Sequence, residues 1–270
     1  MSLLQRAKRL IYLHKFLPKK RLGQTFVVDR ALLQRMISYA SINKGDVVLE
    51  VGAGLGFLTA LLSQECKRVV AVEVDSKLVK ILKDQLHGLQ NVDLIEGDIL
   101  SVNVPPFNKM VSTPPYSISS PILFWLLERA FDCAVLTFQK EFAERMVARV
   151  GSKDYGRLTV STYYRAEVEL LDYVSRDLFY PPPDVDSSVV RLKPRKPPFR
   201  VRDEKIFFEL VRTLFTQRNK KVRNAIVPFL RNRGVKKKDM VKLADSLLFH
   251  DKRVRQLAPE DFGVLADEFA

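Results

Sequence analysis

The sequence predicts an α/β fold, in which a Rossmann-like, mostly parallel sheet is followed by a small all-α domain. Short apolar segments typical of buried strands alternate with amphipathic segments typical of helices. Glycines or acidic residues directly follow the first three of these strands. Beyond a proline-rich break at 193–198, only helical patterns remain. A chain of 270 residues is long enough for one large domain and one small domain.

The net charge of +14 is unevenly distributed along the chain. Residues 1–28 carry +7 and contain no acidic residue, residues 29–190 carry −4, and residues 191–270 carry +11. A near-neutral centre between two basic ends is typical of a catalytic core flanked by surfaces that bind a polyanion. Charge that serves only solubility is the alternative explanation.

Several classes of protein are disfavoured by what the sequence lacks. No apolar run reaches the length of a membrane span, and the first residues do not form a secretory signal. Cys66 and Cys133 are isolated, and the three histidines are scattered, so we expect neither a disulfide framework nor a metal site. We therefore expect a cytoplasmic protein.

The N-terminal residues 1–28 are interpreted as a basic arm. Residues 1–17 predict an amphipathic helix that stays mobile until it meets a partner and ends at Pro18. A basic run then leads into an apolar cluster, and we expect this run to contact phosphate groups. The basic run consists of Lys19, Lys20 and Arg21. Asp29 is expected to cap the next helix and to open a core domain at 29–195.

Alternating elements predict the doubly wound sheet of the core domain. The strands are expected at 46–51, 68–74, 92–96, 109–112, 133–138 and 189–192. The helices are expected at 31–39, 57–64, 76–86, 122–131, with Pro121 at its first position, and 141–150. Residues 158–164 fit a helix or a strand equally well. The helical domain, 196–270, is predicted to hold helices at 206–215, 222–229, 239–247 and 260–269.

A glycine-rich loop follows the first core strand. Gly52, Gly54 and Gly56 allow the backbone to approach a ligand at the start of a helix, although packing of a tight turn is the alternative. Glu50 precedes the loop. Phe57 stands where a dinucleotide-binding fingerprint has its third glycine, which disfavours an oxidoreductase.

Two further acidic residues end the next two strands. Glu73 is placed to accept hydrogen bonds from two ribose hydroxyls, and Asp98 is placed to accept one from an adenine amine. Because the carboxyl ends of parallel strands meet at one edge of a sheet, these groups converge with the glycine loop. The cofactor that fits them is S-adenosylmethionine, which carries adenine, ribose and a cationic sulfur.

The loop Thr113-Pro114-Pro115-Tyr116 follows the fourth strand. It resembles the (Asp/Asn/Ser)-Pro-Pro-aromatic loop of enzymes that methylate exocyclic amines of bases. Such an amine is a poor nucleophile, and two loop acceptors, the Thr113 side chain and the Pro114 carbonyl, can each take one N–H. Tyr116 can stack on a flipped-out base. The alternative is a rigid turn with Tyr116 in the core.

Further motifs make this resemblance specific. They include Lys20-Arg21-Leu22-Gly23-Gln24-x-Phe26, Tyr116-x-Ile118-Ser119-Ser120-Pro121, Phe179-x-Pro181-Pro182-Pro183-x-Val185-Asp186-Ser187 and Phe215-x-x-Arg218-x-Lys220-x-x-Arg223-Asn224. The chain resembles the small-subunit ribosomal RNA adenine-N6 dimethyltransferases, which are related to the erythromycin-resistance methylases. The resemblance implies a monomer that uses S-adenosylmethionine. Its partner is implied to be the immature small ribosomal subunit, where two adjacent adenosines near the 3′ end of the rRNA each receive up to two methyl groups.

The resemblance also implies which residues form the site. The catalytic residues are expected to be Thr113, Pro114 and Tyr116. The cofactor-binding residues are expected to be Gln24, Thr25, Val27, Glu50, Gly52, Gly54, Glu73, Val74, Asp98, Ile99 and Thr113. The RNA-binding residues are expected to be Lys19, Lys20, Arg21, Arg157, Arg218, Lys220, Lys221 and Arg223; a solvated helix face is the alternative for the last four.

The sequence departs from the family pattern at Thr25 and Thr113, where the family has Asn. A threonine hydroxyl is shorter than a carboxamide, and its proton can point the wrong way. We expect slower catalysis, and an rRNA-binding assembly factor with weak or lost activity is the alternative function. A methyltransferase acting on DNA or on protein glutamine is a third reading, disfavoured by the match outside the loop.

Overall fold

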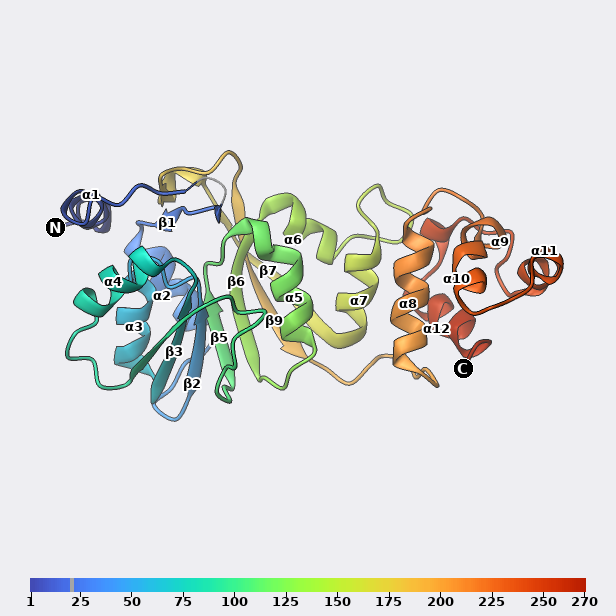
Figure 1. Ribbon diagram of the computed structural model, residues 1–270, viewed down its shortest axis with the longest axis horizontal. Coiled ribbons are helices and arrows are strands. Elements are labelled where there is room, and N and C mark those ends of the chain that lie inside the picture. Colours follow the sequence, from blue (N-terminus) through green and yellow to red (C-terminus); the bar gives the residue numbers. More distant parts are fainter. Residues whose placement is uncertain (20–21) are drawn as a thin grey trace. The chain divides into compact units, whose positions relative to one another are not determined.

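The computed structural model describes residues 1–19 and 22–270, which form two compact units (Figure 1). Unit 1 comprises Met1–Ala143 and Glu169–Pro194, and unit 2 comprises Glu144–Val168 and Arg195–Ala270. The expected contiguous domains differ from these units. Residues 144–168 pack with the C-terminal helices, and the chain then returns to unit 1 before it reaches the proline-rich break.

Unit 1 is built on the predicted doubly wound sheet. Among the described residues, its strand order is β4-β3-β2-β5-β6-β9-β7. The five strands from β2 to β6 run parallel, and β9 runs antiparallel to β6. The strands are β2 (Val47–Val51), β3 (Arg68–Glu73), β4 (Val92–Glu96), β5 (Lys109–Ser112), β6 (Cys133–Gln139), β7 (Ala166–Val174) and β9 (Ser187–Pro194).

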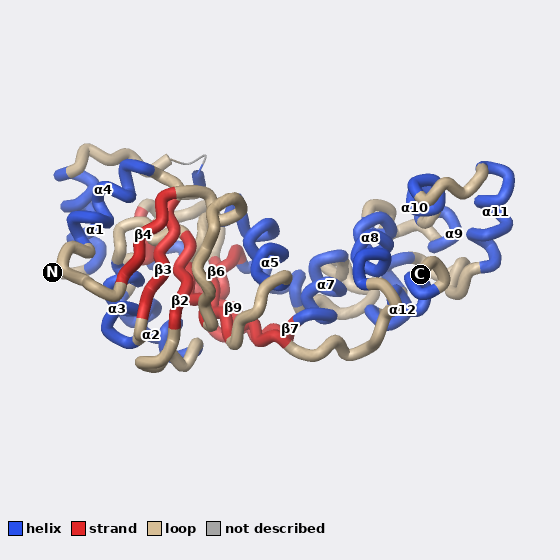
Figure 2. Tube along the Cα trace, turned by 60° about the horizontal axis from the view of Figure 1, so that its bottom comes forward, coloured by secondary structure: helices blue, strands red, loops and turns tan. Residues whose placement is uncertain are grey.

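Helices pack against this sheet and bury its apolar strands (Figure 2). They are α2 (Arg30–Tyr39), α3 (Phe57–Glu65), α4 (Ser76–Gln85) and α5 (Ser119–Leu127). Val48 and Val69 of the central strands are fully buried with Leu32 and Leu62 of the helices, as a sheet covered by helices requires. The parallel arrangement brings the carboxyl ends of β2, β3 and β5 to one edge.

The N-terminal residues do not form the separate, mobile arm that we expected. Helix α1 (Leu3–Leu13) belongs to unit 1, where Ala7, Leu10 and Phe16 are buried in the core. The helix also ends before Pro18. Lys15 has a left-handed backbone (φ 47°), and the N–H of Phe16 donates to the carbonyl of Ile11 (2.9 Å). This closure ends the helix without a proline.

Several other element boundaries differ from prediction. Helix α5 begins at Ser119, because a 3-10 turn at Tyr116–Ile118 leads into it, so Pro121 is not its first residue. Helix α6 (Lys140–Met146) ends before 150. Residues 158–164, which fitted a helix or a strand equally well in the sequence, lie within helix α7 (Arg157–Arg165). Strand β7 and the small sheet of β1 (Phe26–Val27) and β8 (Phe179–Tyr180) were not predicted.

Unit 2 is helical and has its own core. Tyr155, Phe207, Phe229 and Phe262 are fully buried together. The expected helix at 222–229 is two helices, since Pro228 cannot donate the backbone hydrogen bond that a continuous helix requires. Besides α7, the unit contains α8 (Glu204–Phe215), α9 (Val222–Ala225), α10 (Val227–Asn232), α11 (Lys237–Ser246) and α12 (Pro259–Asp267). No helix in the described parts of the chain could span a membrane.

Candidate active site

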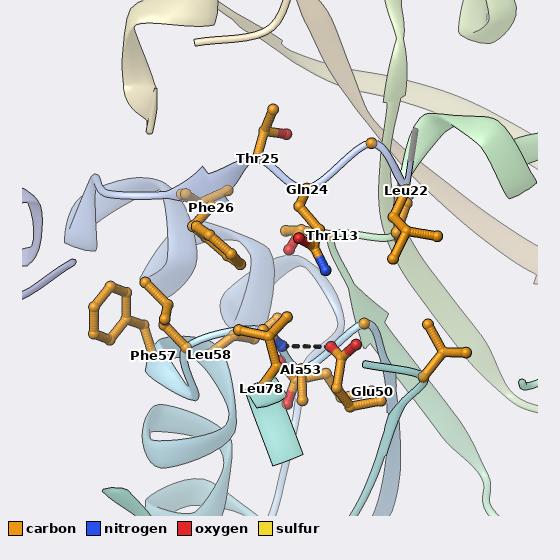
Figure 3. Close-up of a pocket in the computed structure, with 18 of the residues that line it drawn as sticks. Leu22, Gln24, Thr25, Phe26, Glu50, Ala53, Phe57, Leu58, Leu78 and Thr113 are labelled. Atoms are coloured by element: carbon orange, nitrogen blue, oxygen red, sulfur yellow. Dashed lines mark hydrogen bonds between the residues drawn. The ribbon is translucent and has the colours of Figure 1, made fainter. Parts of the chain in front are cut away.

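A pocket opens in unit 1 at the edge of the sheet where β2, β3 and β5 end (Figure 3). The segment 22–27 forms one wall, and the loops after β2 and β5 form others. Most of the predicted cofactor residues line this pocket. They are Gln24, Thr25, Val27, Glu50, Gly52, Gly54, Glu73, Val74 and Thr113.

Two predicted cofactor residues lie outside this lining. Ile99 is buried, and Asp98 is exposed on the loop after β4, where its Oδ1 accepts the N–H of Leu100 (3.0 Å). Strand β4 lies beyond β3 in the sheet, and the Asp98 carboxylate turns back to stabilise its own loop. The structure thus shows Asp98 at the predicted strand end without bringing it to the pocket.

The glycines of the loop after β2 allow two other segments to approach. Gly52 has a φ of 77°, and a Cβ added there would lie 3.1 Å from Cδ of Pro115. Gly54 has a φ of 58°, and a Cβ there would lie 2.9 Å from the Phe26 ring. Only glycine combines such backbone angles with such close packing. The loop therefore packs directly against the Thr-Pro-Pro-Tyr loop and strand β1.

Glu73 fixes the conformation of the glycine loop. Its Oε2 accepts the N–H of Gly54 (3.0 Å). Its Oε1 accepts the N–H of Asp75 (2.9 Å). Burial raises the pKa of Glu73, and the backbone donors offset part of that rise. Each carboxylate oxygen can accept a second hydrogen bond, so the group can still bind hydroxyls in the pocket.

Glu50 is a buried acid that lacks a partner on one oxygen. Its side chain lies at the pocket with 1% exposure, and Oε2 accepts no hydrogen bond among the described residues. Burial raises the pKa of Glu50 to about 8, and nearby Glu73 adds to the rise. The nearby Thr59 hydroxyl offsets part of this rise in pKa. A buried carboxylate without a partner fits a ligand that carries a cation.

A polar cluster fastens the segment 22–27 beside the pocket. The Gln24 amide accepts the N–H of Lys19 (2.7 Å) and donates to Oδ2 of Asp75 (2.8 Å). The Lys19 ammonium pairs with the same buried oxygen (2.8 Å). This ion pair occupies Lys19, which we had expected to contact phosphate. Lys20 and Arg21, assigned the same role, lie outside the described residues.

The loop Thr113–Tyr116 is held from both sides. The Ser112 hydroxyl accepts the N–H of Val51 (2.9 Å) and donates to the carbonyl of Val51 (2.6 Å), which joins β5 to β2 just before the loop. Thr113 is half-buried at the pocket. Tyr116 lies outside the pocket lining, and its hydroxyl hydrogen-bonds the Ser187 hydroxyl. Burial raises the pKa of this phenol.

Ser187 was not assigned a role from the sequence. It begins β9, in register with Gln139 of β6, and it lies 71 positions from Tyr116. No local spacing could indicate a contact across that distance, and only its place in a quoted motif distinguished it.

The basic residues assigned to RNA binding in unit 2 mostly have partners within the unit. The Arg218 guanidinium donates to the carbonyls of Ser152 (2.8 Å) and Lys153 (2.6 Å). Lys221 pairs with Asp251 (2.6 Å), and Arg223 lies 3.8 Å from the same acid. Arg218 lies in the turn after α8, where it binds backbone carbonyls, and is not part of a solvated helix face. Surface ion pairs are weak, so Lys221 and Arg223 can exchange theirs for phosphates.

The other two basic residues assigned to RNA binding in unit 2 are exposed. They are Lys220, in the turn before α9, and Arg157, the first residue of α7. Although the Arg157 side chain is exposed, the protein around it removes part of its hydration and Arg212 repels it, and both lower its pKa. An anion close to Arg157 would therefore be stabilised.

The fold and the pocket place the chain among the S-adenosylmethionine-dependent methyltransferases. The glycine loop at a helix start, the Glu73 carboxylate with acceptor capacity left and the Glu50 oxygen without a partner fit a ligand that carries hydroxyls and an ammonium group, as that cofactor does. The described residues contain no cluster of His, Cys, Asp and Glu that could hold a metal ion.

Comparison with known proteins identifies the family. A family profile described as ribosomal RNA adenine dimethylase matches residues 15–261. A probable ribosomal RNA small subunit methyltransferase A of Methanosarcina acetivorans is 44% identical over 246 residues, covering 90% of this chain and 91% of the relative. The Methanopyrus kandleri protein of the same description is 44% identical over 255 residues, covering 92% of this chain and 91% of the relative.

Two solved structures support the assignment. A dimethyladenosine transferase from Plasmodium falciparum is 32% identical, with a TM-score of 0.80 over 90% of this chain and 97% of the other. The 23S rRNA methyltransferase ErmE is 31% identical, with a TM-score of 0.65 over 90% of this chain and 98% of the other. The chain belongs to the ribosomal RNA adenine dimethylase family.

Proposed function

We propose that the protein methylates the N6 amine of two adjacent adenosines near the 3′ end of small-subunit rRNA, adding up to two methyl groups to each. The observation that carries this proposal is the loop Thr113–Tyr116, which packs on Gly52 at the edge of the cofactor pocket. The names of the curated relatives support the small subunit as the source of the RNA.

The cofactor, when bound, supplies an electrophilic methyl group. We assign its ribose hydroxyls to Glu73 and its ammonium group to Glu50. Asp98 stays a proposed partner of the adenine amine, because it follows the next strand at the same edge of the sheet. The backbone of Gly52 and Gly54 is proposed to lie against the ligand, because both residues line the pocket at the start of helix α3.

The target amine is proposed to bind at the Thr113–Tyr116 loop. The Thr113 hydroxyl and the Pro114 carbonyl would each accept one N–H, which favours a pyramidal nitrogen with a free lone pair. The Tyr116 ring would stack on the flipped-out base. Proline at 114 and 115 limits the motion of the loop, so the acceptors are positioned before the substrate arrives.

Small-subunit rRNA is the proposed partner, and we propose that the immature subunit is the form recognised. The charge of +11 on residues 191–270 supports an anionic partner. Lys220 and Arg157 are the proposed phosphate contacts that are exposed, and Lys221 and Arg223 would join them by exchanging surface ion pairs.

Methylation mapping tests the proposed function. Small-subunit rRNA from cells with and without the protein should differ at two adjacent adenosines near the 3′ end. Purified protein should also transfer labelled methyl groups to immature subunits from the deficient cells. Thr113 favours a second function, that of an assembly factor with little activity. Binding to immature subunits without any methyl transfer would support that second function.

A further inference from the structure

Helix α1 has no role in the function proposed so far. The family profile matches from residue 15 onward, whereas α1 spans Leu3–Leu13. The helix is nevertheless fixed to unit 1. Its Arg6 guanidinium lies 5.3 Å from the centre of the Phe57 ring and donates to Gln85 at the end of α4 (3.4 Å). Figures 1 and 2 both draw α1 beside α4.

The inner side of α1 contacts the walls of the cofactor pocket. Phe16, just after the helix, is 1% exposed and packs on Phe26, with 6.3 Å between ring centres. Phe26 and Phe57 both line the pocket and are labelled in Figure 3. Because α1 is held at Arg6 and Phe16, its outer side is a fixed platform attached to the catalytic unit.

The outer side of α1 combines exposed apolar and basic side chains. Tyr12 is 83% exposed, and Leu13 is 58% exposed. Arg9 precedes Tyr12 by three positions, so it shares its face of the helix. The ammonium of Lys8, four positions before Tyr12, lies 5.5 Å from the centre of the Tyr180 ring and is not counted with them. Lys15 follows with its left-handed backbone. We call these residues the outer face of α1.

The charge and chemistry of the outer face decide its partner. Residues 1–28 contain no acid, so the surface is complementary to a polyanion. An exposed aromatic ring between cations fits unpaired nucleotides, whose bases stack while the cations contact phosphates. A membrane-binding helix needs a broad apolar face. In α1, Ala7 and Leu10 are buried against the protein, and the exposed Leu4 and Leu13 are separated by basic residues.

We propose that the outer face of α1 binds an unpaired stretch of the rRNA substrate. Tyr12 stacks on a base, and Arg9 and Lys15 contact the adjoining phosphates. The proposal rests on the proposed function only in that RNA is the partner. It adds a contact formed by a helix that precedes the region matched by the family profile.

The test uses the full-length chain and an unmethylated transcript of the 3′ segment of small-subunit rRNA. Fluorescence anisotropy should show that the double variant Arg9→Gln/Tyr12→Ala raises the Kd about tenfold or more. The slope of log K against log salt should become shallower by about one, since one phosphate contact is lost. Binding of S-adenosylmethionine and the thermal midpoint should not change.

Two single variants serve as controls. Tyr12→Trp keeps an aromatic ring and should bind the transcript with an affinity close to that of the wild type. Lys67→Gln removes an exposed charge just before β3, at the end of the sheet where the parallel strands begin and away from the pocket. It should leave the Kd unchanged. A loss with Lys67→Gln as large as that of the double variant would mean that only net charge matters, which overturns the proposal.

The remaining outcomes also decide the matter. A double variant that binds the transcript as tightly as the wild type overturns the role of α1 and leaves the proposed function intact. A wild-type protein that does not bind the transcript overturns the role of α1, whereas the proposed function is decided by methyl transfer to immature subunits. Vesicles of phosphatidylglycerol and phosphatidylcholine test the membrane directly. Loss of vesicle binding in the double variant, with unchanged RNA binding, would assign the outer face to lipid and overturn the proposal.

Discussion

The hydroxyl of Tyr116 hydrogen-bonds the hydroxyl of Ser187, which begins strand β9. This contact ties the catalytic loop to the antiparallel part of the sheet. The ring proposed to stack on the target base is therefore held at its far end by a residue that does not line the pocket. Ser187 is expected to position Tyr116 without touching the substrate.

Removing either hydroxyl should slow methyl transfer to a similar extent. We expect Ser187→Ala and Tyr116→Phe each to lower kcat about fivefold, because one hydrogen bond contributes about 1 kcal/mol. The double variant should lose little more, since both changes remove the same contact. Tyr116→Ala, which removes the ring, should nearly abolish transfer while calorimetry still detects cofactor binding. Additive losses in the double variant would rule out a shared role.

Replacing Thr113 with asparagine should accelerate the first methylation more than the second. The unmodified amine offers two N–H groups and needs both acceptors, whereas a monomethylated amine offers one. A longer carboxamide at Thr113→Asn is expected to stabilise the first transition state by about 1–3 kcal/mol. Mass spectrometry of a time course resolves the two steps. Abundant monomethyladenosine in the wild-type reaction would contradict a slow first step.

Glu50 should make the stability of the cofactor-free protein depend on pH. Its pKa is raised from 4.5 to about 8, so the folded chain retains a proton that the unfolded chain releases in this range. The free energy of unfolding should therefore fall as pH rises from about 4.5 to about 8, by at most about 1.4 kcal/mol per pH unit from this group. Glu50→Gln should flatten that slope in denaturant titrations.

The same residue should couple cofactor binding to proton release. A bound ammonium group favours the ionised Glu50, so binding at pH 7 should release protons. Calorimetry in buffers of different ionisation enthalpy measures the number of protons released on binding. In Glu50→Gln both this number and the affinity for the cofactor should fall. Equal proton release by both proteins would show that Glu50 is not the partner of the ammonium group.

Comparing alanine variants of Gly54 and Gly88 distinguishes the cost of a strained backbone from the effect of crowding the pocket wall. Gly54→Ala combines a positive φ with a contact of 2.9 Å to Phe26, so it should weaken both stability and cofactor binding. Gly88 has a φ of 88° and no neighbour within 4 Å. Gly88→Ala should therefore lose only about 1 kcal/mol of stability and bind the cofactor normally. Equal cofactor affinities in the two variants would count against a role for the Gly54 approach.

Lys15 offers a test in which stability and binding move in opposite directions. Its left-handed backbone (φ 47°) is unfavourable for lysine by roughly 1 kcal/mol, and glycine at this position suits the end of a helix. Lys15→Gly should keep or raise the unfolding midpoint yet weaken binding of the rRNA transcript severalfold. A less stable variant with unchanged affinity would show the reverse of this expectation.

The parallel core could be predicted because its signals are local. Strand β2 is apolar almost throughout and leads directly into glycines, so both its burial and its end are visible in the sequence. Strand β7 was missed because it is an end strand of the sheet, with half-exposed positions and interspersed acids that resemble a surface segment. The end of α1 was misplaced because a lysine occupies the left-handed position that glycine usually marks.

Pocket residues could be predicted where their position at a strand end decides their place. They could not be predicted where their role depends on a hydrogen-bond partner far away in the sequence. Glu50, Gly52 and Thr113 line the pocket as expected from strand ends. The pairing of Lys19 with Asp75 spans 56 positions, and the sequence shows only a lysine in a basic run. Arg218 is likewise bound to carbonyls more than 60 positions away.

The division of the chain has a consequence for its synthesis. Helix α7 is synthesised before β9, yet its Val160 and Tyr164 are buried in the core of unit 2. There the ring centres of Tyr164 and Phe207 of α8 are 4.9 Å apart. A nascent chain therefore carries these side chains uncovered until α8 has left the ribosome. Unit 1 is complete at Pro194, so the cofactor pocket can form while the helical unit is still unfinished.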